Sequence, residues 1–141
     1  MLIRTAAARW EGNLKEGKGN IRLGSGAYDG PYSFNSRFEQ GTGTNPEEML
    51  GGAHAGCFTM ALSLGLTTAG HPPTSLETTA KVHLARVSEV LTITAIELIT
   101  EGRVPGISAA EFERLAQDAK RNCILSRAIS APISLKATLV T

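Results

Sequence analysis

Two cysteines are the residues most capable of chemistry, because this chain of 141 residues contains no others. Cys57 and Cys123 are 66 positions apart, a spacing that fits neither a zinc-binding pair nor a Cys-x-x-Cys motif. A free cysteine is most often a small buried hydrophobe, and burial raises its thiol pKa. Cys57 becomes a nucleophile only if a cation or hydrogen-bond donors favour its thiolate. Two lone cysteines in an intracellular chain also fit a catalytic dithiol.

His54 precedes Cys57 by about one helical turn, so it could serve as the base of a Cys–His hydrolase or acyl transferase. The plainer interpretation is a core histidine that is bonded to the backbone. The sequence contains no His-Glu-x-x-His pattern, and neither His71 nor His83 has the spacing of a metal ligand. We therefore expect no metal site.

Arg37 and Glu47 are candidate partners of a reactive thiol, although each also has an ordinary interpretation. Arg37 lies in Phe34–Glu39, which reads as a strand with its two phenylalanines on one face and Arg37 on the other. That face would normally be solvated. Glu47 falls in the first turn of a predicted helix, where the helix dipole stabilises a carboxylate.

The first 44 residues are rich in glycine and turn signals, which predicts a β-meander. We expect strands at 6–10, 20–23 and 33–39, and turns at 15–19 and 29–31. After the meander, Asn45-Pro46-Glu47-Glu48 is typical of a helix start, with Asn45 as the cap and Glu48 closing a capping box.

Residues 49–69 contain no Asp, Glu, Lys or Arg, so this run must be considered as a membrane span. Its many small and hydroxyl residues, His54 and the lack of Lys and Arg at its flanks favour the buried helix of a soluble core. Gly52 and Gly56 would let a neighbour cross closely, and that neighbour could belong to a second subunit.

The second half of the chain alternates between strand and helix patterns. Residues 76–87 and 91–99 predict a hairpin, Ser108 begins a helix that closes at 118–121, and 133–139 predict a final strand. No linker or repeat interrupts the pattern, so we expect one domain over residues 1–141.

Composition excludes several classes of function. Lys and Arg total 14 and Asp and Glu total 13, while aromatic residues make up 5%, so the chain is a poor nucleic-acid binder. The N-terminus lacks the apolar run of a signal peptide, which predicts a cytoplasmic protein with reduced thiols.

Several segments together resemble one known family. Thr44–Phe58, TNPEEMLGGAHAGCF, resembles the first-cysteine motif of the OsmC/Ohr family of thiol peroxidases, and Pro31–Phe38 resembles the segment that supplies the family's active-site arginine. Residues 104–107, Val-Pro-Gly-Ile, and the second cysteine follow in the expected order. Residues 8–19 are similar to the OsmC branch rather than to the Ohr branch. The resemblance covers nearly the whole chain.

The resemblance implies an OsmC-like α+β fold, with antiparallel sheets wrapped around two central helices in an intertwined homodimer. Cys57 would be the peroxidatic thiol, Cys123 the resolving thiol, Arg37 the activating cation and Glu47 its partner. The substrate would be an organic hydroperoxide, and an external dithiol, which the family suggests is carried by a lipoylated protein, would reduce the Cys57–Cys123 disulfide. No cofactor, membrane or nucleic acid is implied. Family members commonly have proline after the second cysteine, where this chain has Ile124.

Helix geometry adds an inference about the subunits. Glu47 and Cys57 are ten residues apart, which on a continuous helix is about 15 Å. If Glu47 serves a reactive Cys57, either the helix breaks or the glutamate comes from another subunit. The apolar neighbours Phe58, Met60 and Leu64 predict a preference for organic peroxides.

Three alternatives stay open at this point. The first is the hydrolase or transferase that uses Cys57 and His54. The second is a non-catalytic dimer that binds a small ligand, and the third is a structural disulfide between the two cysteines.

Overall fold

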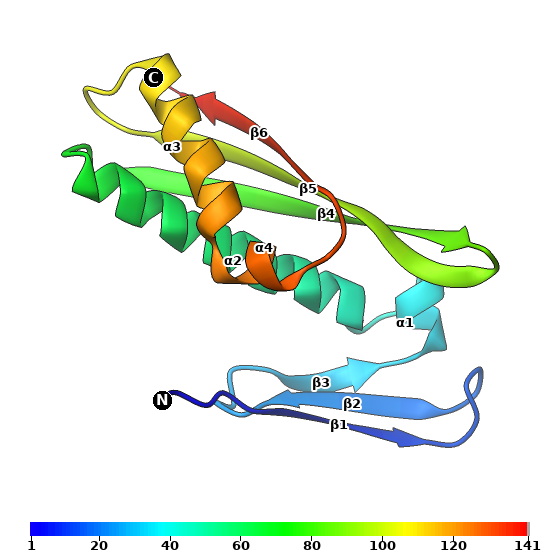
Figure 1. Ribbon diagram of the computed structural model, residues 1–141. Helices are drawn as coiled ribbons and strands as arrows, with labels where there is room; N and C mark the ends of the chain where they lie inside the picture. Colours follow the sequence, from blue (N-terminus) through cyan, green and yellow to red (C-terminus); the bar gives the residue numbers. More distant parts are fainter. Residues whose placement is uncertain (141) are drawn as a thin grey trace. The chain divides into compact units, whose positions relative to one another are not determined.

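The computed structural model describes residues 1–140, and its mixed helices and strands confirm the α+β class (Figure 1). The elements within this range are β1 (Ala6–Glu11), β2 (Lys18–Leu23), β3 (Asp29–Tyr32), α1 (Phe34–Phe38), α2 (Pro46–Thr68), β4 (Ser75–Val87), β5 (Val90–Arg103), α3 (Ala109–Asn122), α4 (Ile124–Ala128) and β6 (Ile133–Leu139). Two compact units are present, Met1–Met49 and Leu50–Thr141. The single domain expected over residues 1–141 stays a prediction.

The N-terminal unit contains the predicted meander, with β1, β2 and β3 pairing antiparallel in chain order. The expected third strand at 33–39 was wrong, because that segment forms α1 and the expected turn at 29–31 belongs to β3. Two serines explain the helix: the Ser33 side chain accepts the Ser36 N–H at 3.1 Å, and the Ser36 hydroxyl accepts the Ser33 N–H at 2.8 Å. This is a capping box without the usual Glu or Gln at its third position.

Helix α2 begins and ends as the sequence predicts, and it is continuous over 23 residues. Asn45 Oδ1 accepts the Glu48 N–H at 2.7 Å. The Glu48 carboxylate does not close the predicted capping box but accepts the Thr44 hydroxyl at 2.9 Å. At the other end Gly70 has a φ of 88°, in the left-handed region that glycine adopts readily, and the helix stops.

The C-terminal unit is built on a second sheet of order β4-β5-β6. β4 and β5 form the predicted antiparallel hairpin. β6 instead runs parallel to β5, which differs from the expected antiparallel sheets. The reason is the connection: α3 and α4 carry the chain back along the sheet before β6 begins, and parallel neighbours need such a crossover. Figure 1 shows this return path.

One hydrophobic core holds this unit together. α2 contributes every fourth residue, and these positions are fully buried: His54, Phe58, Leu62 and Leu66. They pack with Ile96 and Leu98 of β5 and with Phe112 and Ala116 of α3. Burying each large side chain contributes about 1.5–3 kcal/mol, so this cluster fixes where α2 lies on the sheet.

The other face of α2 is apolar and exposed. Met60 and Leu64 are 77% and 70% exposed, and the positions where Cβ atoms would stand on Gly52 and Gly56 have open space around them. Among the described residues, α2 is the one helix long and apolar enough to cross a membrane by length and composition. Its buried stripe of core residues is instead typical of a helix packed in a globular unit.

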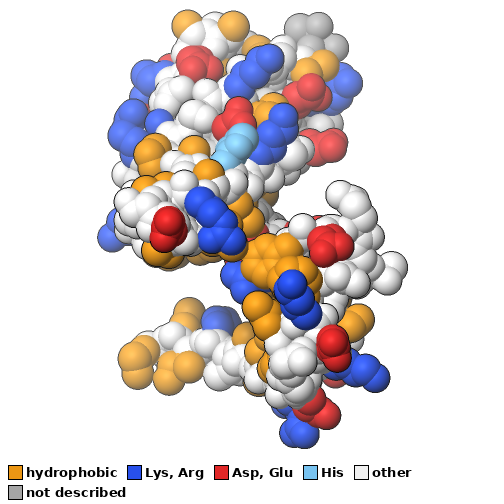
Figure 2. Space-filling model, turned by 90° about the vertical axis from the view of Figure 1, so that its right-hand side faces the viewer, with side chains coloured by type: hydrophobic (Ala, Val, Ile, Leu, Met, Phe, Trp, Pro, Cys, Tyr) orange, Lys and Arg blue, Asp and Glu red, His pale blue; other side chains and the backbone are white. Residues whose placement is uncertain are grey.

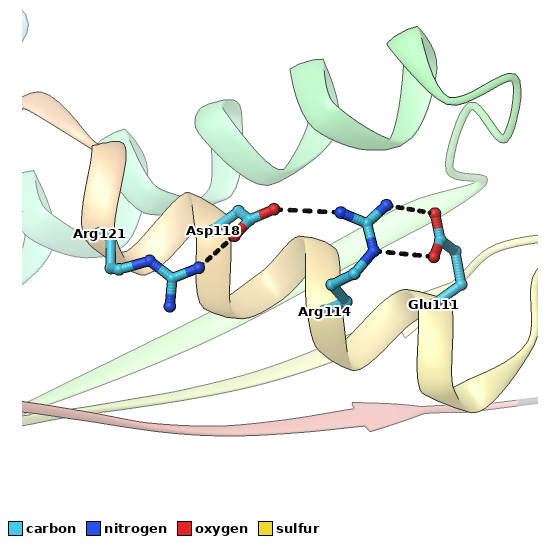
Figure 3. A network of polar contacts seen from close by, with 4 residues as sticks. All are labelled: Glu111, Arg114, Asp118 and Arg121. Carbon is cyan, nitrogen blue, oxygen red and sulfur yellow. Dashed lines mark hydrogen bonds and ion pairs between the residues drawn. The ribbon is translucent and has the colours of Figure 1, made fainter.

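The exposed face of α3 carries charges, in contrast with α2. Glu111, Arg114, Asp118 and Arg121 form a chain of ion pairs at spacings of three and four residues (Figure 3). Such exposed pairs add little stability, but they mark this face as solvated. Hydrophobic side chains also reach the surface on the side drawn in Figure 2, and the β4–β5 turn exposes Val87 and Val90.

Candidate active site

The two cysteines come together within the C-terminal unit. Cys57 lies on α2, and Cys123 lies at the junction of α3 and α4, where it ends one helix and caps the next. Both are free thiols. Each thiol shifts the pKa of the other, so the two lie next to each other, and the Leu125 N–H lies 3.5 Å from Cys57 Sγ. Residues 66 positions apart in sequence therefore form a dithiol.

Cys123 is surrounded by hydrogen-bond donors. It is 2% exposed, and its sulfur accepts both the N–H and the O–H of Ser126, each at 3.4 Å. Burial opposes ionisation most strongly. The donors of Ser126, together with the Cys57 thiol and the Leu125 N–H, outweigh burial and lower the pKa of Cys123.

Cys57 shows the opposite balance. Burial raises its pKa, the neighbouring Cys123 raises it further, and only the backbone N–H groups of Leu125 and Ile124 act against them. The surroundings thus favour the thiolate on Cys123 and the neutral thiol on Cys57. A peroxidatic Cys57 needs a cation that does not appear among these causes.

Ile124 stands where the family resemblance leads us to expect proline. It is the first residue of α4, directly after the Cys123 cap, and proline favours the same position in a helix. The backbone N–H that Ile124 retains helps to lower the pKa of Cys57, and proline has no such group.

His54 was expected to bond either the backbone or Cys57, and its partner is a different group. Its Nε2 lies 2.8 Å from Ser126 Oγ, so it bonds neither the backbone nor Cys57, and the proposed Cys–His pair is not formed. The ring is fully buried, which lowers its pKa, and Nδ1 has no hydrogen-bond partner among residues 1–140. Sequence reasoning missed Ser126. Its place three residues after Cys123 was the one available signal, because the short helix α4 that contains it was not expected from the sequence.

Arg37 and Glu47 meet within the N-terminal unit. Arg37 Nε donates to Glu47 Oε1 at 2.9 Å and Nη2 donates to Oε2 at 2.8 Å, so the contact is bidentate. The Glu47 side chain is 13% exposed and that of Arg37 is 39% exposed. The hydrogen bonds to Glu47 raise the pKa of Arg37, which keeps its positive charge permanent.

An aromatic cleft of about 200 Å³ lies beside Arg37 in the same unit. Its lining is Trp10, Leu14, Tyr32, Ser33, Phe34, Arg37 and Phe38. The apolar residues expected around Cys57 were Phe58, Met60 and Leu64. Of those, Phe58 is a core residue, whereas Met60 and Leu64 lie on the exposed face of α2.

Helix α2 is continuous, and this is the case in which a glutamate serving Cys57 would have to come from another subunit. No break separates Glu47 from Cys57, so their Cα atoms are about 15 Å apart along the helix. Glu47, held to Arg37 through both oxygens, therefore does not reach the thiol that follows it on its own helix.

Comparisons with known proteins agree on one family. The family model described as OsmC-like protein matches residues 39–138. Peroxiredoxin OsmC of Escherichia coli (strain K12) is 50% identical over 129 residues, covering 91% of this chain and 90% of that protein, and Peroxiredoxin OsmC of Shigella flexneri gives the same values.

Solved structures support the same fold. The organic hydroperoxide resistance protein OhrB of Bacillus subtilis has a TM-score of 0.73 at 22% identity, covering 96% of this chain and 98% of its own. An OsmC-like protein of unknown function from Vibrio cholerae has a TM-score of 0.79 at 15% identity, covering 97% and 99%. The chain belongs to the OsmC family, in its OsmC branch.

Proposed function

We propose that this chain reduces organic hydroperoxides to alcohols with Cys57 as the peroxidatic thiol and Cys123 as the resolving thiol. Peroxidase-type redox chemistry is the function of the chain as a member of this family. The observation that carries the finer proposal is that the only two cysteines lie next to each other as free thiols. A hydrolase would have no use for the second thiol.

The chemistry proceeds in three steps. The Cys57 thiolate attacks the terminal peroxide oxygen, the O–O bond breaks, and the alkoxide leaves and takes a proton to become the alcohol. Cys57 is then a sulfenic acid. The Cys123 thiolate attacks that sulfur, the S–S bond forms, and hydroxide leaves. An external dithiol finally reduces the disulfide by exchange and becomes oxidised itself.

The Arg37–Glu47 pair supplies the cation that Cys57 lacks, and we assign it to the Cys57 of a second copy. Glu47 fixes the plane of the guanidinium through two hydrogen bonds, which leaves Nη1 outside that bidentate contact. A fixed positive charge favours the thiolate and stabilises the developing alkoxide. The distance of about 15 Å along α2 supports assignment to the partner rather than to the same chain.

The exposed face of α2 supports a homodimer. Met60 and Leu64 present large apolar side chains to the surface, and Gly52 and Gly56 present backbone without side-chain obstruction. A second α2 crossing here would cover the apolar face and bring two Cys57-bearing helices together. This is the arrangement that the family resemblance implies.

The cleft beside Arg37 supports a preference for organic substrates. Its Trp10, Leu14, Phe34 and Phe38 side chains offer apolar surface for the organic group of the peroxide, next to the guanidinium that would hold the O–O group. Removing alkyl surface from water stabilises binding by about 25 cal/mol per Å², which hydrogen peroxide does not gain.

The remaining partners are assigned by chemistry and by family. The reductant must be a dithiol, because one disulfide takes two electrons, and the resemblance suggests a lipoylated protein. A dithiol cycle of this kind needs a compartment that keeps reductant available, which supports the cytoplasm. The reaction as written needs no cofactor.

Thiol counting under anaerobic conditions tests the proposal. One equivalent of cumene hydroperoxide should remove two thiols from each wild-type chain but one from Cys123→Ala, in which the sulfenic acid has no partner. A dimedone adduct on Cys57 in that variant identifies the site of attack. Retention of both thiols in the wild type contradicts the proposal.

A further inference from the structure

Three side chains form a hydrogen-bonded line in the C-terminal unit that the peroxidase chemistry above does not use in full. His54 Nε2 lies 2.8 Å from Ser126 Oγ, and Ser126 Oγ lies 3.4 Å from Cys123 Sγ. His54 is fully buried on α2, one turn before Cys57. The contacts of this buried histidine therefore connect it, through Ser126, to a reactive thiol.

The direction of this line follows from the unpaired ring nitrogen. If Nε2 carries the proton, His54 donates to Ser126 and Nδ1 is a bare acceptor. If Nδ1 carries the proton, a buried N–H donor has no partner among the described residues. Orphaned N–H groups are the rarer and costlier case in protein interiors, so the Nε2–H form is favoured.

That form leaves the serine hydrogen free for the sulfur. A hydroxyl has one hydrogen and two lone pairs, so Ser126 accepts from His54 with one lone pair and directs its O–H to Cys123 Sγ. The Ser126 N–H points at the same atom. The sulfur thus receives two donors from one residue.

We propose that His54 is a positioning residue for the resolving step: through Ser126 it holds a hydrogen-bond donor on Cys123 Sγ and favours its thiolate. The role in resolution rests on the proposed function, whereas the effect on Cys123 ionisation does not. Among the described residues, Cys57 is the titratable side chain that also shifts the pKa of Cys123. His54 exchanges no proton in the cycle and stays neutral.

The consequence for the reaction lies in the second step. The Cys123 thiolate supplies the electron pair of the new S–S bond, the S–O bond of the Cys57 sulfenic acid breaks, and the departing hydroxide takes a proton from water. The rate of this attack follows the thiolate fraction of Cys123. A slower attack leaves the sulfenic acid exposed to a second peroxide, which oxidises it to sulfinic acid.

A Cys57→Ser background leaves Cys123 as the only thiol. Its ionisation is then measured by following the thiolate absorbance at 240 nm as a function of pH. We expect Ser126→Ala and His54→Leu to raise the Cys123 pKa by about one unit, a tenfold fall in thiolate at fixed pH. His54→Gln, which keeps an N–H donor at a similar reach, should restore most of the shift. Ser130→Ala, an exposed serine beyond α4, is the matched control and should change nothing.

The second measurement keeps Cys57 and follows disulfide formation after one equivalent of cumene hydroperoxide. Ser126→Ala should slow this step about threefold, because the tenfold loss of thiolate is partly offset by the greater nucleophilicity of a more basic thiolate. Sulfinic acid should increase, with the sulfenic acid itself formed at the wild-type rate. An unchanged Cys123 pKa in Ser126→Ala overturns the proposal even if His54→Leu fails to fold. A raised pKa with unchanged disulfide formation overturns the role in resolution.

Failure of the proposed function looks different from either result. In that case wild-type protein forms no disulfide with peroxide, while the ionisation of Cys123 still depends on Ser126.

Discussion

A heterodimer in which the two subunits carry different lesions tests the shared site most directly. One chain carries Arg37→Met, which keeps an aliphatic stem near the Phe38 ring that lies 5.1 Å from Arg37 Cζ, and the other carries Cys57→Ser. In a symmetric dimer with sites shared between chains, this pairing leaves one site with both its arginine and its cysteine. Each parent homodimer has none.

The size of the effect follows from the charges. A cation near a thiol lowers its pKa by about 1–3 units, so the Arg37→Met homodimer should lose about 10- to 1000-fold of wild-type peroxidase activity. The Cys57→Ser homodimer should lose all of it. The heterodimer keeps one intact site of two, so we expect about half the wild-type turnover with cumene hydroperoxide. The two chains carry different affinity tags, and tandem purification isolates the mixed species.

The matched control places both lesions in one chain and pairs it with a wild-type chain. If the site is shared, each site of this dimer lacks one group, and the protein should be nearly inactive. If the site lies within one chain, the pattern reverses: this dimer keeps half the activity and the first heterodimer keeps almost none. That reversed pattern would refute the argument from the continuous α2 helix.

Three further predictions concern the core, the exposed helix face and pH. Phe58→Ala should lower the free energy of unfolding by about 3–5 kcal/mol in urea titration, because Phe58 is fully buried, and a loss below 1 kcal/mol would contradict its place in the core. Met60→Glu with Leu64→Glu should leave the secondary structure intact by circular dichroism but yield monomers in sedimentation and low peroxidase activity; an active dimer would rule out this face as the interface. Burial lowers the pKa of His54 in the folded protein, so the unfolded chain binds the proton more readily. The free energy of unfolding should therefore keep its full value above about pH 6.5. Below that pH it should fall by up to about 1.4 kcal/mol per pH unit. His54→Gln should flatten that dependence between pH 5.5 and 7.5, and an equally steep curve would assign it elsewhere.

Local signals in the sequence were enough to predict the long elements. The Asn45 cap and the uncharged run led to α2, and Ser108 led to α3, because capping and periodicity are properties of neighbouring residues. The prediction of a strand at 33–39 was wrong for the same reason, because it rested on neighbouring residues alone. Phe34 and Phe38 are four apart, which fits one face of a helix as well as one face of a strand, and the rings lie 5.2 Å apart on α1.

Contacts between distant segments were not predictable from periodicity. Nothing in residues 124–128 announced a short helix, and nothing in the 133–139 pattern showed that β6 would pair parallel to β5. The resemblance to a family, rather than spacing, suggested that Cys57 and Cys123 act together. The link from His54 to Ser126 spans 72 positions and depends on the packing of α2 against the α3–α4 junction.

The capping role of Cys123 ties the backbone to the oxidation state. Its sulfur accepts the N–H of Ser126 in the first turn of α4, and the same sulfur must turn toward Cys57 when a disulfide forms. Oxidation therefore withdraws the acceptor that secures the first turn of a five-residue helix. The amide hydrogens of this turn should exchange with solvent deuterium faster in the oxidised protein, so that a visiting reductant meets a loosened segment where the reduced protein presents an ordered one.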